Sequence, residues 1–173
     1  MPLSKQPILK AEFSVIRNYL LAGLFMGFIA VFPLNAANIS FLVMETGESR
    51  EDPAYQYPIL WENGLLEIFF EAGHIVSNFP IMQIAGKPAD GFPDEAKENF
   101  EDARMGGMDF FLVGIVDYTQ SGVSLRLFST KSPKMIQEQK YTVTSFRSTK
   151  EEYENIKTAV SKMAARLNQE GKR

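Results

Sequence analysis

Apolar and polar residues follow one another in blocks along the chain, and the period of each block predicts a type of secondary structure. Residues 38–45 ("NISFLVME") and 108–118 ("MDFFLVGIVDY") are almost continuously apolar. Apolar runs of this length without alternation are typical of strands that are covered on both faces of a sheet. We therefore expect two central, buried strands.

The segment that follows Pro58 has the 3.6-residue period of an amphipathic helix. Its apolar face consists of Trp61, Leu65, Ile68, Phe69, Ala72 and Val76. Pro58 suits the first helical position and Gly73 the residue just past the end, so residues 46–57 should form an exposed loop. Gly64 weakens this helix by about 1 kcal/mol of propensity.

A second amphipathic helix is expected near the carboxyl end, where Ser148 and Glu151 have the spacing of a capping box. Its apolar stripe consists of Tyr153, Ile156, Val160, Met163, Ala164 and Leu167. Charged residues lie mostly on the opposite face: Glu151, Glu154, Lys157, Lys162 and Arg166. This pattern is typical of a helix that packs on a sheet and exposes its charged face to solvent.

The remaining segments complete the predicted order β-α-β-α-β-β-β-α. Residues 74–84 should be extended, 85–93 a loop, and 94–107 a short polar helix that ends at Gly106 and Gly107. Residues 123–129 alternate between apolar and polar, which predicts a half-buried strand antiparallel to its neighbour, and 135–146 should return beside it. The fold class is α/β (α+β): a mixed sheet with helices packed on it, in a single domain of residues 38–173.

An N-terminal hydrophobic segment precedes this domain. Lys5, Lys10 and Arg17 are followed by a 14-residue apolar run from Tyr19 to Phe32, and alanines follow at 36 and 37. A basic region, an apolar region and a small-residue exit are typical of a secretory signal peptide. Because a spanning helix needs about 20 apolar residues, residues 1–37 are interpreted as a signal peptide or, alternatively, as an uncleaved membrane anchor. Both place the domain outside the cytoplasm, in the periplasm or cell envelope.

Composition narrows the chemistry. The chain has no cysteine, which excludes thiolate nucleophiles, cysteine-based metal sites and a lipidated cysteine, and its net charge of −3 argues against nucleic-acid binding. Glu67, Glu71 and His74 have the spacing of a two-metal carboxylate site, but such a site needs a second Glu-x-x-His helix, and His74 is the only histidine. We expect no metal, no cofactor and no catalytic residue, with His74 making a local hydrogen bond.

Two features remain open to other readings. Acidic residues flank the first predicted loop, and one more lies near the end of a predicted strand: Glu45, Glu48, Glu51, Asp52 and Asp117. A carboxylate-based hydrolase needs two carboxyl groups at a set separation. The sequence alone does not give that separation, so this alternative stays open. Tyr55, Tyr57 and Trp61 form an aromatic cluster, which is either a partner-binding patch or a tryptophan that covers the core beside loop tyrosines. Because long loops often carry function, residues 46–57 and 85–93 are the expected interaction surfaces.

The order of elements resembles that of small α/β domains of bacterial envelope proteins. These include the amino-terminal domain of TolB, the penicillin-binding-protein activator LpoB, and domains of curli-secretion and flagellar accessory proteins. The resemblance rests on "ISFLVM", on "LLEIFFEAGHIV" with its glycine, and on Gly-Met-Asp leading into "FFLVGIVDY". The chain differs in having neither a lipidation cysteine nor a propeller.

The resemblance implies a non-enzymatic adaptor or accessory module that binds other envelope proteins and touches a membrane only through an uncleaved N-terminal segment. The alternatives are a structural subunit anchored by that segment and a carboxylate- or metal-dependent envelope hydrolase.

Overall fold

The computed structural model describes residues 36–47, 51–142 and 149–170, with the backbone alone at 51–56 and 168–170. Ten elements follow one another: β1 (Asn38–Thr46), α2 (Glu51–Glu71), β2 (Ile75–Asn78), β3 (Met82–Ile84), η1 (Asp94–Ala96), α3 (Lys97–Met105), β4 (Phe110–Asp117), β5 (Gly122–Ser129), β6 (Ser132–Thr142) and α4 (Thr149–Glu170). The predicted N-terminal signal or anchor and the predicted cap Ser148 lie outside the described residues.

The sheet is mixed, as expected, with strand order β2-β1-β4-β5-β6. β1 pairs in parallel with β2, β3 and β4, and its register with β4 runs without a break from Ile39–Phe110 to Thr46–Asp117. β5 and β6 extend the sheet as an antiparallel meander. The two apolar runs of the sequence therefore form the central parallel pair, β1 and β4.

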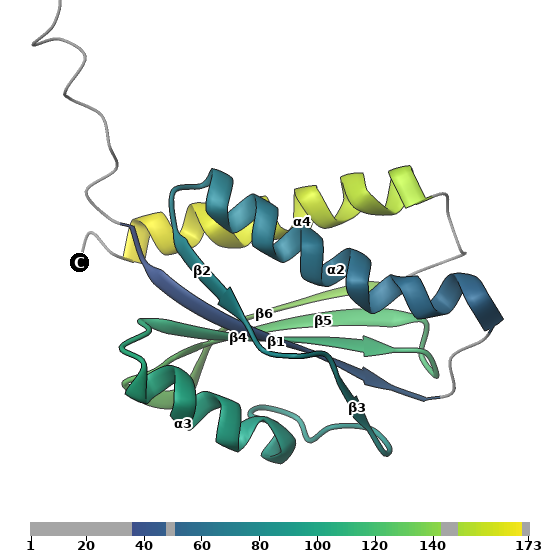
Figure 1. The fold of residues 1–173 in the computed structure, drawn as a ribbon, viewed down its shortest axis with the longest axis horizontal. Helices are drawn as coiled ribbons and strands as arrows, with labels where there is room; N and C mark the ends of the chain where they lie inside the picture. Colours follow the sequence, from purple (N-terminus) through teal and green to yellow (C-terminus); the bar gives the residue numbers. More distant parts are fainter. Residues whose placement is uncertain (1–35, 48–50, 143–148, 171–173) are drawn as a thin grey trace, which may run out of the picture. The chain divides into compact units, whose positions relative to one another are not determined.

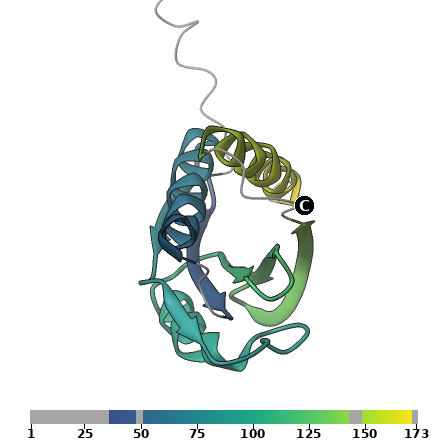
Figure 2. The ribbon, with the colours of Figure 1, turned by 90° about the vertical axis from the view of Figure 1, so that its right-hand side faces the viewer.

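Helices cover both faces of this sheet. Figure 1 shows α2 and α4 side by side over one face, with α3 on the other, and Figure 2 shows the same three layers from the side. The cover on both faces explains why Leu112, Val113 and Ile115 of β4 are all buried although they point to opposite sides.

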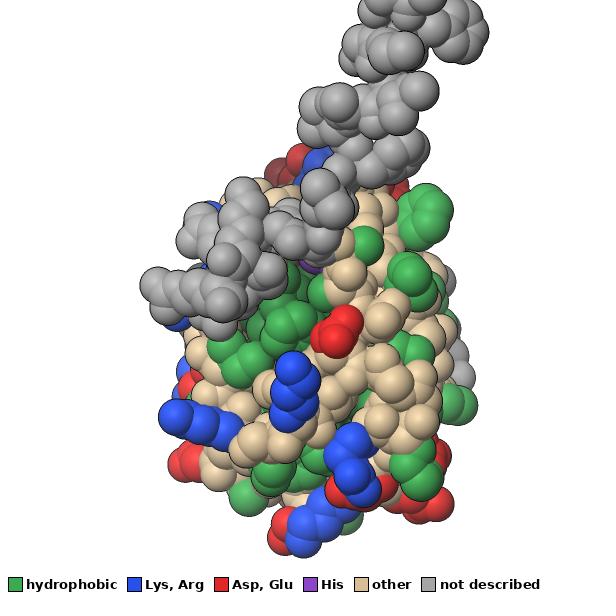
Figure 3. Space-filling view, turned by 90° about the vertical axis from the view of Figure 1, so that its left-hand side faces the viewer, with side chains coloured by type: hydrophobic (Ala, Val, Ile, Leu, Met, Phe, Trp, Pro, Cys, Tyr) green, Lys and Arg blue, Asp and Glu red, His purple; other side chains and the backbone are tan. Residues whose placement is uncertain are grey.

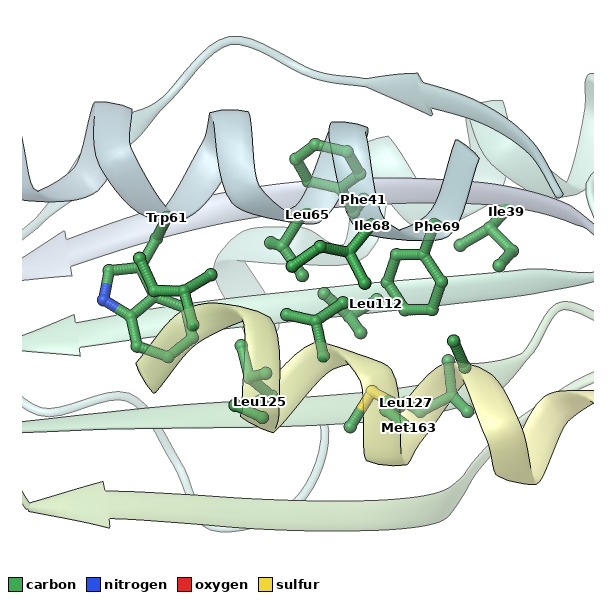
Figure 4. Close-up of a cluster of buried hydrophobic side chains, with 14 of the residues drawn as sticks. Ile39, Phe41, Trp61, Leu65, Ile68, Phe69, Leu112, Leu125, Leu127 and Met163 are labelled. Atoms are coloured by element: carbon green, nitrogen blue, oxygen red, sulfur yellow. The ribbon is translucent and has the colours of Figure 1, made fainter. Parts of the chain in front are cut away.

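Each face has its own hydrophobic core. The larger core joins β1, β4 and β5 to α2 and α4, and Figure 4 shows Trp61, Leu65 and Phe69 of α2 directed toward the sheet and α4. The smaller core lies under α3, where Phe92, Phe100 and Phe111 make edge-to-face and tilted ring contacts. The predicted apolar face of α4 is confirmed, as is that of α2 from Trp61 to Phe69, but Ala72 and Val76 lie beyond the end of α2, with Val76 in β2. The charged residues predicted on the outer face of α4 are exposed.

The predicted start of the first helix is wrong. α2 begins at Glu51, so Pro58 lies inside the helix and the predicted loop of residues 46–57 is mostly helical. Glu51, Asp52 and Pro53 explain the earlier start, because acidic residues and proline both suit a first helical turn. The predicted end is confirmed: α2 stops at Glu71, and Gly73 has a φ of 88°.

Two further predictions need correction. The extended segment at 74–84 is divided into β2 and β3, because Pro80 cannot donate to the ladder. The polar face of β5, expected to be in solvent, is covered at Arg126, which is 3% exposed. No helix of the described part is long and apolar enough to cross a bilayer.

Candidate functional site

A polar pocket of about 190 Å³ lies at the end of the sheet where β4 and β6 finish and β5 begins. The segment 87–90 forms one wall, and the strands form the floor. The residues that line it are Lys87, Pro88, Asp90, Ile115, Asp117, Gln120, Gly122, Val123, Ser124, Arg126, Lys140, Tyr141 and Thr142. The predicted loop surface at 85–93 is therefore part of a hollow rather than a free arm.

Arg126 attaches this loop to the sheet. Its Nη1 donates to the carbonyl oxygens of Ala89 at 2.7 Å and Gly91 at 3.0 Å, and its Nε donates to Oε1 of Glu138 at 3.0 Å. A guanidinium presents several donors in one plane, so one buried side chain holds two loop carbonyls and a strand carboxylate together. Thr46 adds a second attachment, because its hydroxyl donates to the carbonyl of Gly86 at 2.5 Å.

Glu138 is the acidic centre of this network. Its carboxylate also accepts from the Ser124 hydroxyl at 3.3 Å and pairs with Nζ of Lys140 at 3.3 Å. Burial raises the pKa of Glu138, but the bonds from Lys140 and Arg126 outweigh burial, and the net pKa is lowered. The carboxylate is therefore ionised at neutral pH, where it balances one of the two cations that it bonds.

The pocket combines charges of both signs. Lys87 and Asp90 are exposed on the loop, while Asp117 accepts from the backbone of Thr119 at 2.8 Å and thereby shapes the β4–β5 turn. The side chains that line the pocket can hold a small polar or charged group through hydrogen bonds. The lone histidine lies at the opposite end of the strands, so the pocket has no imidazole for acid–base chemistry.

The aromatic cluster predicted for partner binding is divided between the core and the helix interface. Trp61 is 2% exposed, and its ring lies tilted against that of Tyr141 with 5.8 Å between the ring centroids, which favours the interpretation that it covers the core. Tyr57 is half-buried and donates to Oε1 of Glu152 at 2.5 Å. The side chain of Tyr55 lies outside the described part. Partner binding by this cluster stays a prediction.

The glutamates near His74 do not converge on it. His74 is buried, and its Nδ1 accepts from the backbone N–H of Ala37 at 3.2 Å. The expected local hydrogen bond is therefore wrong, because the donor lies 37 residues earlier in the chain. Glu67 accepts instead from the Tyr153 hydroxyl, and Glu71 is exposed. Among the described residues, no three His, Cys, Asp or Glu side chains are grouped so that they could hold a metal ion.

Sequence reasoning missed Arg126 and Glu138 as partners. The signal was present, because a basic residue in one strand and an acidic residue in the next form a favourable cross-strand pair. Their register was not readable, however, since the β5–β6 pairing shifts between Leu127 and Phe128.

No family model matches the sequence, and no curated protein matches it. Among solved structures, similar chains include PelC from Paraburkholderia phytofirmans, solved as a dodecamer (12% identity, 73% of this chain and 87% of that chain, TM-score 0.44). The LpoB C-terminal domain from Escherichia coli is also similar (10% identity, 68% and 90%, TM-score 0.38), as is prolyl-tRNA synthetase from Cryptosporidium parvum (12% identity, 79% and 23%, TM-score 0.33). These likenesses identify neither a family nor a function, and the resemblance to the LpoB and TolB group stays a prediction.

Proposed function

We propose that this chain is a non-enzymatic, exported envelope protein that binds another envelope protein by accepting an extended segment along the outer edge of β6. The open edge of β6 is the observation that carries this proposal. Within the described residues β6 pairs only with β5, so its other side presents backbone donors and acceptors without a strand partner. An exposed edge of this kind can accept a strand from another chain.

The two halves of β6 differ as edges. The first half contains Pro133, Lys134 and the register shift opposite Phe128. A proline, a lysine and an irregular register all discourage edge-to-edge pairing. The second half, residues 137–142, has a continuous register with β5 and ends beside the polar pocket. A strand added there would take its affinity from the main chain and could direct a polar side chain toward the pocket.

Export from the cytoplasm is supported by the basic region and the apolar run within residues 1–37. The adaptor role agrees with what the resemblance to envelope accessory domains implies.

Site-directed photocrosslinking in the cells that make the protein tests this function. A photoreactive amino acid is placed at Lys140 or Thr142, the exposed positions in the second half of β6, with Lys157 on the exposed face of α4 as the matched control. We expect one envelope protein to crosslink to both β6 positions, which are about 7 Å apart along the strand, and not to Lys157. The same products at all three positions, or none at either β6 position, would contradict strand addition.

A further inference from the structure

Large apolar side chains are exposed at the opposite end of the sheet from the pocket. Of the exposed large hydrophobic residues in the described part, Phe70 is 74% exposed, Met105 73%, Ile75 62% and Met135 37%. All four lie at the end where β1 and β4 begin, and only Ile59 (40%) lies elsewhere, in the middle of α2. We call these four residues the entry-end patch.

Backbone hydrogen bonds place the segments next to these residues at one end of the sheet. Ile75 donates its backbone N–H to the carbonyl of Ala37 at 3.0 Å, and Asp109, just after the turn that follows Met105, donates to the carbonyl of Asn38 at 2.8 Å. Thr130, before the β5–β6 turn, donates to the carbonyl of Asp109. The patch therefore surrounds the point at which the chain enters the domain.

Basic side chains accompany the patch. Lys131 in the β5–β6 turn, Lys134 near the start of β6 and Arg166 in the last turns of α4 are exposed, and the exposed acidic residues at the same end include Glu71, Asp102 and Asp109. Figure 3 views this end of the domain, where apolar and basic side chains lie next to one another. Apolar residues next to lysines are typical of a surface that meets lipid headgroups.

The sequence just upstream of the described domain is apolar. Only three residues separate the apolar run Tyr19–Phe32 from Ala36, the first described residue, so those four peptide steps can span at most about 14 Å. A 14-residue helix would be about 21 Å long, whereas the hydrocarbon core is about 30 Å thick. An inserted run this short would be accommodated by local thinning of the bilayer, and a domain joined to it by so short a connection would lie at the bilayer surface, where exposed apolar side chains are tolerated.

We infer that the N-terminal apolar run is retained as a short anchor and that the entry-end patch rests on the surface of the same bilayer. The inference rests on the exported address proposed above, but not on strand addition at β6. It places the patch on lipid and directs the pocket away from the membrane.

Fluorescence quenching on the full chain tests this arrangement. Because the protein has no cysteine, single labels can be placed by Phe70→Cys and Met105→Cys. Ile59→Cys is the matched control, an exposed apolar position about 16 Å earlier along the same helix, and Lys150→Cys marks the other end of the domain. The labelled protein is reconstituted at low density in phosphatidylcholine–phosphatidylglycerol vesicles.

We expect nitroxide-bearing lipids to quench the labels at 70 and 105 several-fold more than those at 59 and 150, and aqueous iodide to give the reverse order. Equal lipid quenching at all four positions would overturn the inference, as would failure of the chain to float with vesicles. Shielding of positions 70 and 105 from both quenchers would overturn it too, because it would mean that another protein surface covers the patch. Retention of the β6 crosslink in any of these cases would leave the proposed function intact.

Discussion

At the scale of single residues, two positions that look unfavourable in the sequence have a clear purpose in the structure. Gly64 weakens α2 in isolation, but a β-carbon there would lie 2.3 Å from Cγ2 of Ile156 on α4. The glycine therefore permits the close approach of the two helices. His74 loses its solvent contact but satisfies the amide of Ala37, which links the end of α2 to the start of β1.

Gly64→Ala should therefore destabilise the fold, although alanine is the better helix former. We expect overpacking against Ile156 to lower the free energy of unfolding by about 1–3 kcal/mol, measured by urea denaturation. Asn63→Ala, at the exposed neighbouring position, is the control and should cause no such loss. Addition of Ile156→Ala to Gly64→Ala should cost less than the sum of the two single changes, and strict additivity would disprove the contact.

His74 should make stability depend on pH. Burial lowers the pKa of His74 below its ordinary value of 6.5, and the backbone of Ala164 opposes this only in part. The unfolded chain then binds a proton that the folded chain does not, so stability is complete above pH 6.5 and falls as the pH drops below it. His74→Asn retains an acceptor for Ala37, and the drop in stability between pH 6.5 and 5 should be smaller than in the wild type. An unchanged pH profile in urea titrations would show that the histidine does not contribute.

At the scale of elements, α2 and α4 are joined by two tyrosine–glutamate hydrogen bonds that run in opposite directions. Tyr57 of α2 donates to Glu152 of α4, and Tyr153 of α4 donates to Glu67 of α2. The two accepting carboxylates have different environments, because Glu152 is buried (6% exposed) whereas Glu67 faces solvent. Burial and the Glu152 carboxylate both raise the pKa of Tyr57, so its hydroxyl remains a donor.

This difference allows a matched test of what Tyr57 does. Tyr57→Phe leaves a buried carboxylate without its donor and should lower the free energy of unfolding by about 1–3 kcal/mol. Tyr153→Phe removes a bond to a solvated carboxylate and should change stability far less. If both variants lose the same amount, the burial of Glu152 has no energetic consequence. If Tyr57→Phe is as stable as the wild type but loses its envelope partner, Tyr57 belongs to the aromatic binding patch.

At the scale of the whole domain, the two ends of the sheet differ in chemistry. One end carries the polar pocket, held by Arg126 between the loop and β6. The other carries the entry-end patch, at the end where β1 and β4 begin. The parallel pair β1–β4 produces this separation, because parallel strands start at one end of a sheet and finish at the other. Strand addition at the second half of β6 and lipid contact at the patch, whose Met135 lies in the first half of that strand, use different parts of the surface and can be tested separately.

The sequence by itself determined the two central strands and the inward faces of the two long helices, because both depend on the period of apolar residues along the chain. Tertiary structure decided the rest. The burial of Arg126, its pairing with Glu138, the close approach at Gly64 and the gathering of Phe70 and Met105 at one end all join residues that are far apart in the chain. Such contacts depend on strand register and helix packing, which a one-dimensional pattern does not encode.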